Sequence, residues 1–154
     1  MTEEQKELLT NDLCGRLPYR VKIKTGYSQI ATLISLRKNI NLYSGKDLSV
    51  TYDISGKDEP FQMEERWGTP ISEIKPYLFP MSSMTEEQEN EWDNLHFNPL
   101  DAILEGKFKG EEERLQLISK SMSDPIQWCY KNHFDCNGLI PLGLAIDCTN
   151  LKIY

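Results

Sequence analysis

The segment Ile74–Gln88, with the sequence IKPYLFPMSSMTEEQ, divides the chain into two parts with different patterns. Pro76 and Pro80 fix φ and disfavour helix in the residue before each of them, so the chain around them is predicted to be extended. Ser83 and Glu86 have the spacing of a capping box, and so do Thr85 and Gln88, which predicts that a helix begins within a residue or two of Thr85. Strands are therefore expected before this segment and helices after it.

The first part of the chain has the pattern of short antiparallel strands. Residues 48–54 show the clearest alternation, with apolar side chains at every second position. Turn-forming clusters containing Gly, Asn or Asp separate the apolar runs, and one such turn is expected at residues 37–39. Strands are predicted at residues 19–24, 28–36, 40–43, 48–54, 61–67 and 75–79, with one helical turn at 69–74.

This order of elements predicts an α+β fold. Several short strands, one helical turn and a closing strand are typical of a small, antiparallel, SH3-like and partly open β-barrel, here at residues 17–79. A helix at residues 1–16 is expected to pack on the barrel, and residues 80–154 are expected to form a helical part with a short C-terminal strand. The three parts are predicted to pack as one compact unit.

The N-terminal helix is predicted at residues 3–13, from the capping-box spacing of Thr2 and Gln5, and Gly15 is a candidate cap at its end. Further helices are expected at 99–105, 111–122 and 125–132, the last restarting at Pro125, and a terminal strand at 151–154. The buried faces of the last two helices are predicted to consist of Leu115, Ile118, Met122, Ile126, Cys129 and Tyr130.

Composition restricts the function classes. The 154 residues include 24 acidic and 17 basic ones, for a net charge of −7, which argues against a general polyanion binder but leaves room for a local basic patch. No apolar run is long enough to cross a membrane, and the acidic N-terminal sequence is unlike a secretory signal, so a cytoplasmic protein is expected. No phosphate-binding glycine loop is present, and no cofactor is predicted.

Weak candidates for a metal site are Cys129, His133, Cys136 and Cys148. Their types suit zinc, but their spacing differs from the two tight pairs of common zinc motifs. In the cytoplasm the cysteines are expected to be reduced thiols. The interpretation favoured by the sequence is therefore structural cysteines and a histidine that caps a helix, with no metal bound.

A nucleophilic site has equally little support. His133, Asp135 and Cys136 are close in sequence and contain a nucleophile, a base and an orienting group, but no local signature places them together. A histidine at the end of a helix more simply meets the free carbonyl groups there. The sequence therefore predicts that the protein is not an enzyme.

Two sets of residues are candidates for binding. The basic face of the first strand contains Arg20, Lys22 and Lys24, with Lys38 in a following loop and Tyr43 nearby, a combination that suits single-stranded nucleic acid. An ordinary solvent-exposed face is the alternative. Trp92 lies in the acidic helix after Thr85, which is a candidate surface for a protein partner or for mimicry of nucleic-acid charge.

Three segments resemble a widespread set of small uncharacterised proteins from Bacteroidetes genomes, phages and prophages. They are DLCGRLPYRVK at residues 12–22, EIKPYLFPMSSMT at 73–85, and NHFD at 132–135 with GLIPLGLA at 138–145. Cys136 stands where that family more often has an aromatic residue. The resemblance implies a protein encoded by a mobile element and expressed in a bacterial cytoplasm, and it implies no activity or cofactor.

Three functions are therefore carried forward. The first is a non-enzymatic phage or prophage accessory protein that binds a macromolecule, with a protein as the expected partner. The second is a nucleic-acid-binding module that uses the basic strand. The third is a small enzyme with a site at His133, Asp135 and Cys136.

Overall fold

The computed structural model describes residues 1–26, 29–41, 45–53, 69–95 and 110–154. Its helices are α1 (Glu3–Arg16), α2 (Glu86–Leu95) and α4 (Glu111–Lys131), and its 3-10 turns are η1 (Leu17–Tyr19), η2 (Ile71–Glu73) and η3 (Met81–Ser83). Its strands are β1 (Lys22–Lys24), β2 (Ile30–Asn41), β3 (Gly45–Asp53), β4 (Thr69–Pro70), β5 (Lys75–Leu78) and β6 (Ile146–Asp147). The predicted α+β class is confirmed.

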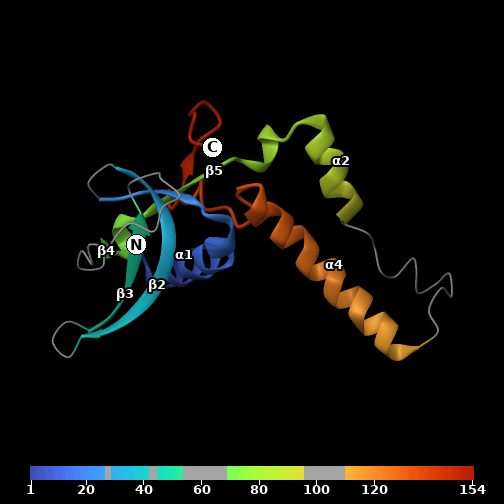
Figure 1. Cartoon of the computed structure of the whole chain (residues 1–154), viewed down its shortest axis with the longest axis horizontal. Helices are drawn as coiled ribbons and strands as arrows, with labels where there is room; N and C mark the ends of the chain where they lie inside the picture. Colours follow the sequence, from blue (N-terminus) through green and yellow to red (C-terminus); the bar gives the residue numbers. More distant parts are fainter. Residues whose placement is uncertain (27–28, 42–44, 54–68, 96–109) are drawn as a thin grey trace.

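The molecule has two parts joined by β5 and the segments around it. Figure 1 shows the sheet and α1 on one side, while α2 and α4 extend away from them on the other. We call α2 and α4 together the helical arm. Among the described residues, no helix is long and apolar enough to cross a membrane.

The strands form one sheet in the order β4-β3-β2-β1-β5-β6. All neighbouring strands are antiparallel except β5 and β6, which are parallel. Among the described strands, β4 and β6 are the two edges, so the sheet is open and does not close into a barrel. The helical turn predicted before the last strand is present as η2, and the last strand is β5.

Strand β2 is longer than the sequence predicts. The prediction of a turn at residues 37–39 is wrong, because β2 continues through these residues and pairs with β3. The register of β2 against β3 shifts between Leu33 and Ser35, and the beginning of β2 also pairs with β1 along its other edge. The backbone hydrogen bonds to β3 outweigh the local turn preference of these polar residues. The strand predicted at 61–67 lies outside the described residues.

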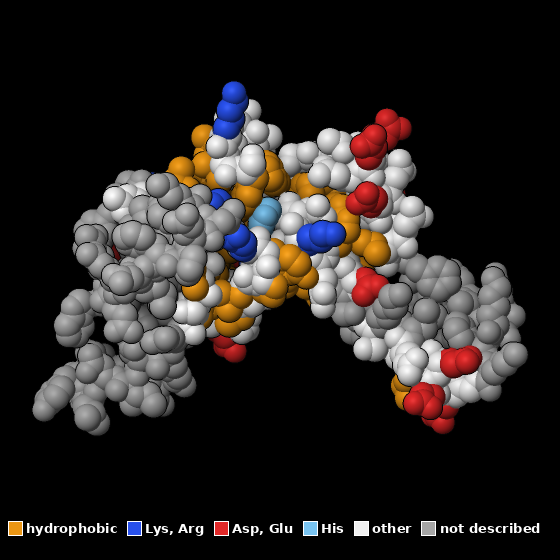
Figure 2. Space-filling model, viewed as in Figure 1, with side chains coloured by type: hydrophobic (Ala, Val, Ile, Leu, Met, Phe, Trp, Pro, Cys, Tyr) orange, Lys and Arg blue, Asp and Glu red, His pale blue; other side chains and the backbone are white. Residues whose placement is uncertain are grey.

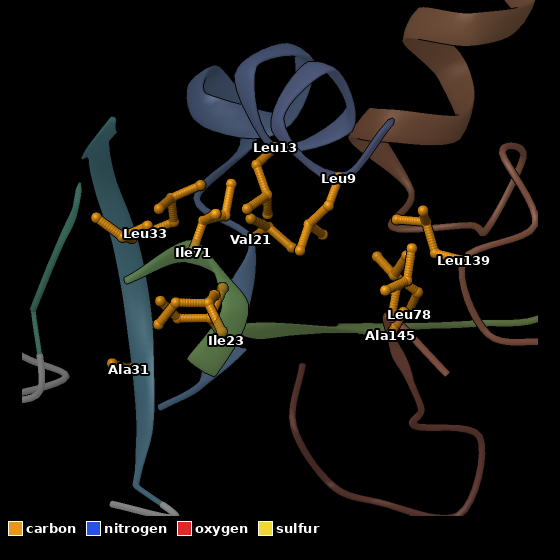
Figure 3. Packing of buried hydrophobic residues seen from close by; sticks show 13 residues of the cluster. Leu9, Leu13, Val21, Ile23, Ala31, Leu33, Ile71, Leu78, Leu139 and Ala145 are labelled. Atoms are coloured by element: carbon orange, nitrogen blue, oxygen red, sulfur yellow. The ribbon is translucent and has the colours of Figure 1, made fainter. Parts of the chain in front are cut away.

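The core lies between α1 and one face of the sheet. Leu9 and Leu13 of α1 are buried against Val21 and Ile23, in a cluster that extends to β2. Figure 3 shows these side chains converging beneath α1, with the C-terminal segment contributing from the other end. The cluster also contains Ala31, Leu33, Val50, Ile71, Ile74, Leu78, Leu139, Leu144 and Ala145.

Both predicted helix starts are confirmed. At α1 the backbone N–H of Gln5 donates to Thr2 Oγ1 over 3.2 Å, and the side chain of Gln5 accepts from the Thr2 N–H. The same reciprocal bonds join Thr85 and Gln88 at the start of α2. The end of α1 differs from the prediction, because the helix continues through Gly15 to Arg16.

Helix α4 corrects two further predictions. It is one helix through Pro125, because a proline removes one backbone hydrogen bond and weakens a helix without necessarily ending it. Leu115 and Ile126, predicted to be buried, are 62% and 47% exposed. Helical periodicity identifies an apolar face but does not show whether anything covers it. Cys129, by contrast, is buried as predicted.

The C-terminal segment forms its strand earlier than expected. The terminal strand predicted at residues 151–154 is wrong, because the pairing with β5 occurs at β6. Tyr154 is held through its side chain instead, whose hydroxyl group bonds to the sheet. The helix predicted at 99–105 lies outside the described residues.

Candidate functional site

The outer face of β1 and β5 carries three lysines. These strands pair with Ile23 opposite Pro76 and Lys24 opposite Lys75. Ile23 and Pro76 are buried, so the alternation of a strand places the lysines on the face away from the core. We call the surface formed by Lys22, Lys24 and Lys75 the lysine face.

Lys24 and Lys75 lie directly opposite each other on neighbouring strands. Side chains in such a pair start about 5 Å apart at Cβ, and like charges there are destabilising. In the described part of the chain, neither lysine has a side-chain hydrogen bond or an ion pair. Lys22 donates one hydrogen bond from Nζ to Thr32 Oγ1, at 2.7 Å, which leaves two of its three donors. The pairing therefore has no evident benefit for folding.

Tyr154 lies beside the lysine face and joins β1 to β5. Its hydroxyl oxygen accepts from the backbone N–H of Lys22, at 3.0 Å, and the hydroxyl donates to the carbonyl of Tyr77, at 2.9 Å. Burial of this hydroxyl between the strands raises the pKa of Tyr154. The residue as a whole is nevertheless 47% exposed.

The ring of Tyr154 stacks on the imidazole of His133, with centroids 3.9 Å apart and planes at 12°. His133 has a φ of 59°, and its carbonyl accepts from the N–H of Phe79. Its Nδ1 is buried without a partner. Burial, together with the charges of Arg16 and Lys22, lowers the pKa of His133 to about 4.

The proposed His133, Asp135 and Cys136 site is not assembled in this geometry. Both carboxylate oxygens of Asp135 accept backbone hydrogen bonds, from the N–H groups of Leu139 at 2.7 Å and Ile140 at 2.8 Å. Asp135 therefore holds the turn that follows it, while His133 stacks on an aromatic ring. The imidazole and the carboxylate have separate structural partners.

Cys136 contacts a different partner, the thiol of Cys129. Their hydrogen bond is the main cause that lowers the pKa of Cys136 and raises that of Cys129. Cys148 is buried, and its burial raises its pKa to about 11. Within the described ranges, no three His, Cys, Asp or Glu side chains converge as metal ligands would.

A buried ion pair lies next to these thiols. Arg16 donates from Nε to one oxygen of Asp12 over 2.6 Å and from Nη2 to the other over 3.0 Å, and both side chains are fully buried. Nη2 also donates to the carbonyl of Phe134, and the guanidinium lies 4.7 Å from the ring centroid of Tyr130. The sequence analysis missed this pair. Its i, i+4 spacing in a predicted helix is a usable signal, but it does not reveal burial.

The helical arm has a different chemical character. Its acidic residues are exposed except for the half-buried Asp124, and Figure 2 shows the red side chains mostly over the arm. Trp92 packs on Trp128 with ring centroids 5.6 Å apart, and Trp128 Nε1 donates to Glu91. Trp92 is thus half-buried within the arm.

The structure brings together some of the predicted binding residues. Lys22 and Lys24 share one face, but Arg20 precedes the strand in a left-handed conformation with φ 55°. The backbone of Lys38 belongs to β2, while its side chain and the whole of Tyr43 lie outside the described residues. Lys75 was missed, because only the pairing of β5 with β1 brings it to this face.

Comparisons with known proteins add no relationship to these observations. No protein-family model matches the chain, no curated protein matches its sequence, and no solved structure matches it.

Proposed function

We propose that this is a non-enzymatic phage or prophage accessory protein that acts in the bacterial cytoplasm by binding a protein partner through its helical arm. The observation that carries the proposal is the uncovered apolar face of α4. Leu115 is 62% exposed, and Ile126 is 47% exposed.

These two side chains lie on one face of the helix. They are three helical turns apart, since a turn contains 3.6 residues, and Ile118 lies between them and is half-buried. Exposed apolar side chains amid polar ones mark candidate interaction sites, and these two are about 16 Å apart along the helix axis. A helix face of this length fits an amphipathic helix or a shallow groove of a partner.

The charges around this face indicate the kind of partner. Glu111 and Glu112 are exposed at the start of α4. The sequence of α2 contains five acidic residues and no lysine or arginine. Complementary charge steers association and selects partners. The partner is therefore expected to present apolar side chains flanked by Lys and Arg.

Two further parts of the proposal rest on resemblance. The strand order β4-β3-β2-β1-β5, with a 3-10 turn between β4 and β5, supports an SH3-like arrangement in which the sheet remains open. The segments at 12–22, 73–85 and 132–145 support an origin in phage or prophage genomes of Bacteroidetes.

The test is an affinity pull-down from host lysate, treated with nuclease, comparing the wild type with Leu115→Glu. Leu142→Glu is the matched control, because Leu142 is 48% exposed on the C-terminal segment instead of the arm. A partner retained by the wild type and the control but lost by Leu115→Glu supports the proposal. Equal retention by all three proteins contradicts it.

A further inference from the structure

We propose that the lysine face binds single-stranded nucleic acid, with Lys22, Lys24 and Lys75 contacting phosphates and the ring of Tyr154 stacking on a base. This surface is separate from the helical arm, and the inference does not rest on the proposed protein partner. It also differs from the basic set expected from the sequence, because Lys75 replaces Arg20 and Tyr154 replaces Tyr43.

The first argument is electrostatic. Lys24 and Lys75 are paired across two strands without a counter-ion in the described part of the chain. Their mutual repulsion is relieved by an anion that contacts both. Lys22 follows on the same face of β1, two residues and therefore about 7 Å from Lys24. The lysine face is thus a row of positive charges that suits a chain of phosphates better than one small anion.

The distribution of the acidic residues explains how such a surface fits a chain with net charge −7. Many of the described acids belong to the helical arm, which extends away from the sheet. Exposed charges separated by more than about 10 Å are largely screened from each other in salt. Local potential at the lysine face is therefore governed by its own lysines and by nearby chain segments.

The second argument concerns the aromatic ring. The two hydrogen bonds of its hydroxyl anchor Tyr154 at the Lys22 end of the face, and His133 supports one side of its ring. The residue as a whole is 47% exposed, and a fixed aromatic ring beside positive charges is the arrangement that binds unpaired bases by stacking. Lys131 and Lys152, both exposed, lie within two residues of His133 and Tyr154 in the chain.

Single strands are favoured over duplexes for a physical reason. In a duplex the bases are stacked inside the helix, so a tyrosine side chain cannot stack on one of them unless that base leaves the stack. The small number of lysines also predicts modest affinity. Three phosphate contacts on a single strand give a salt slope of about −2, or about a 20-fold loss of affinity between 50 mM and 200 mM salt.

The experiment measures fluorescence anisotropy of a labelled oligothymidylate of about 12 nucleotides, with the full chain, over that salt range. Lys75→Glu is expected to weaken binding about tenfold, because it replaces a phosphate contact by a repulsive charge. The same change creates an opposite-charge pair with Lys24, so the melting temperature should stay constant or rise. If Lys75 were merely structural, Lys75→Glu would lower the melting temperature and leave binding by the folded protein unchanged.

Lys6→Glu is the matched control. It changes the net charge equally, but Lys6 lies on α1, the helix that covers the other face of the sheet. Undetectable binding at low salt, or equal losses in Lys75→Glu and Lys6→Glu, would overturn the proposal.

Two variants of Tyr154 test the stacking component. Tyr154→Phe keeps the ring but loses two hydrogen bonds, so it should bind normally and melt at a lower temperature. Tyr154→Ala should remove the preference for the single strand over a duplex of the same length, provided that its circular dichroism remains native. A preference for duplex in the wild type, or loss of binding in a folded Tyr154→Phe, would overturn the assignment of base stacking.

Discussion

Arg16 connects three parts of the chain through one buried guanidinium group. Its partners are Asp12 on its own helix, the carbonyl of Phe134 and the ring of Tyr130. Burial alone would lower the pKa of Arg16, but its hydrogen bond to Asp12 and the charge of that carboxylate raise it above the ordinary value. Arg16 therefore remains charged, and Asp12 compensates that charge inside the protein.

Asp12→Ala should lower the free energy of unfolding by about 3–5 kcal/mol, because it leaves a buried cation without its carboxylate. The measurement is urea denaturation followed by circular dichroism. The double variant Asp12→Leu/Arg16→Met should recover much of this loss, since apolar residues of similar size replace both charges. A loss below about 1 kcal/mol in Asp12→Ala would show that Arg16 is solvated or finds another partner.

His133 predicts a dependence of stability on pH. Its pKa is about 4 in the folded protein, against 6.5 for an ordinary histidine, so the unfolded chain binds a proton that the folded one does not between these values. Stability should therefore decrease as pH falls from about 6.5 to about 4, and this contribution should level off below that range. Urea denaturation at several pH values measures it.

His133→Asn is the control for this prediction. Asparagine tolerates the left-handed backbone of this position but does not titrate. The difference in unfolding free energy between wild type and variant should change with pH between about 4 and 6.5. Its slope should approach the value for one proton bound by the unfolded chain and not by the folded one. A constant difference would mean that His133 titrates normally in the folded state.

At the scale of the elements, Gly15 of α1 packs against the ring of Tyr130 of α4. A Cβ atom at this position would collide with the ring of Tyr130, with Cδ2 and Cζ each 2.8 Å away. Alanine normally stabilises a helix interior by about 1 kcal/mol relative to glycine. Here the collision outweighs that preference.

Gly15→Ala should therefore destabilise the protein by about 1–3 kcal/mol, as overpacking usually does. Thermal and urea denaturation measure the change. Gly110→Ala is the control, because nothing lies within 4 Å of a Cβ atom there, and as an N-cap change it should cost no more than about 1 kcal/mol. Stabilisation by Gly15→Ala would show that Tyr130 can move away at little cost.

The elements that could be predicted from the sequence are those specified by local chemistry. The side-chain caps at Thr2 and Thr85 act within one helical turn, and both helix starts follow from them. Strand β2 depends instead on its pairing with β3, which supplies hydrogen bonds to residues that locally favour a turn. Local patterns do not contain that long-range information.

The same distinction applies to the lysine face. Alternation in the sequence is enough to place Lys22 and Lys24 on one side of β1. Lys75 joins them only because β5 pairs with β1 in the register that sets it opposite Lys24. Arg20 is not part of the lysine face, because its backbone is left-handed and the alternation of the strand begins only after it. A sheet register must be known before such a surface can be assembled.

At the scale of the whole molecule, a chain of aromatic rings joins the helical arm to the sheet. Trp92 packs on Trp128, Trp128 stacks on Phe134 with planes at 2°, and Phe134 lies 6.0 Å from Phe79 beside β5. Phe79 in turn contacts Tyr154. Figure 1 shows that the arm extends away from the sheet at this junction, so these rings are a major part of its support.

Trp128→Ala should therefore release α2 while leaving the sheet folded. Amide hydrogens of α2 should exchange roughly tenfold faster, which corresponds to about 1.4 kcal/mol of local stability. Hydrogen exchange with mass spectrometry measures this, and the amides of β1 and β2 are the internal reference. Equal acceleration in both parts would show that the arm and the sheet unfold together.

The contact between Trp92 and Trp128 also has an optical consequence. Two indoles 5.6 Å apart and inclined by 49° are close enough for their electronic transitions to couple. Such coupling produces paired bands of opposite sign in the circular dichroism spectrum, which disappear when the rings separate. The arm thus contains its own spectroscopic reporter, and a movement of α2 relative to α4 can be followed without attaching a dye.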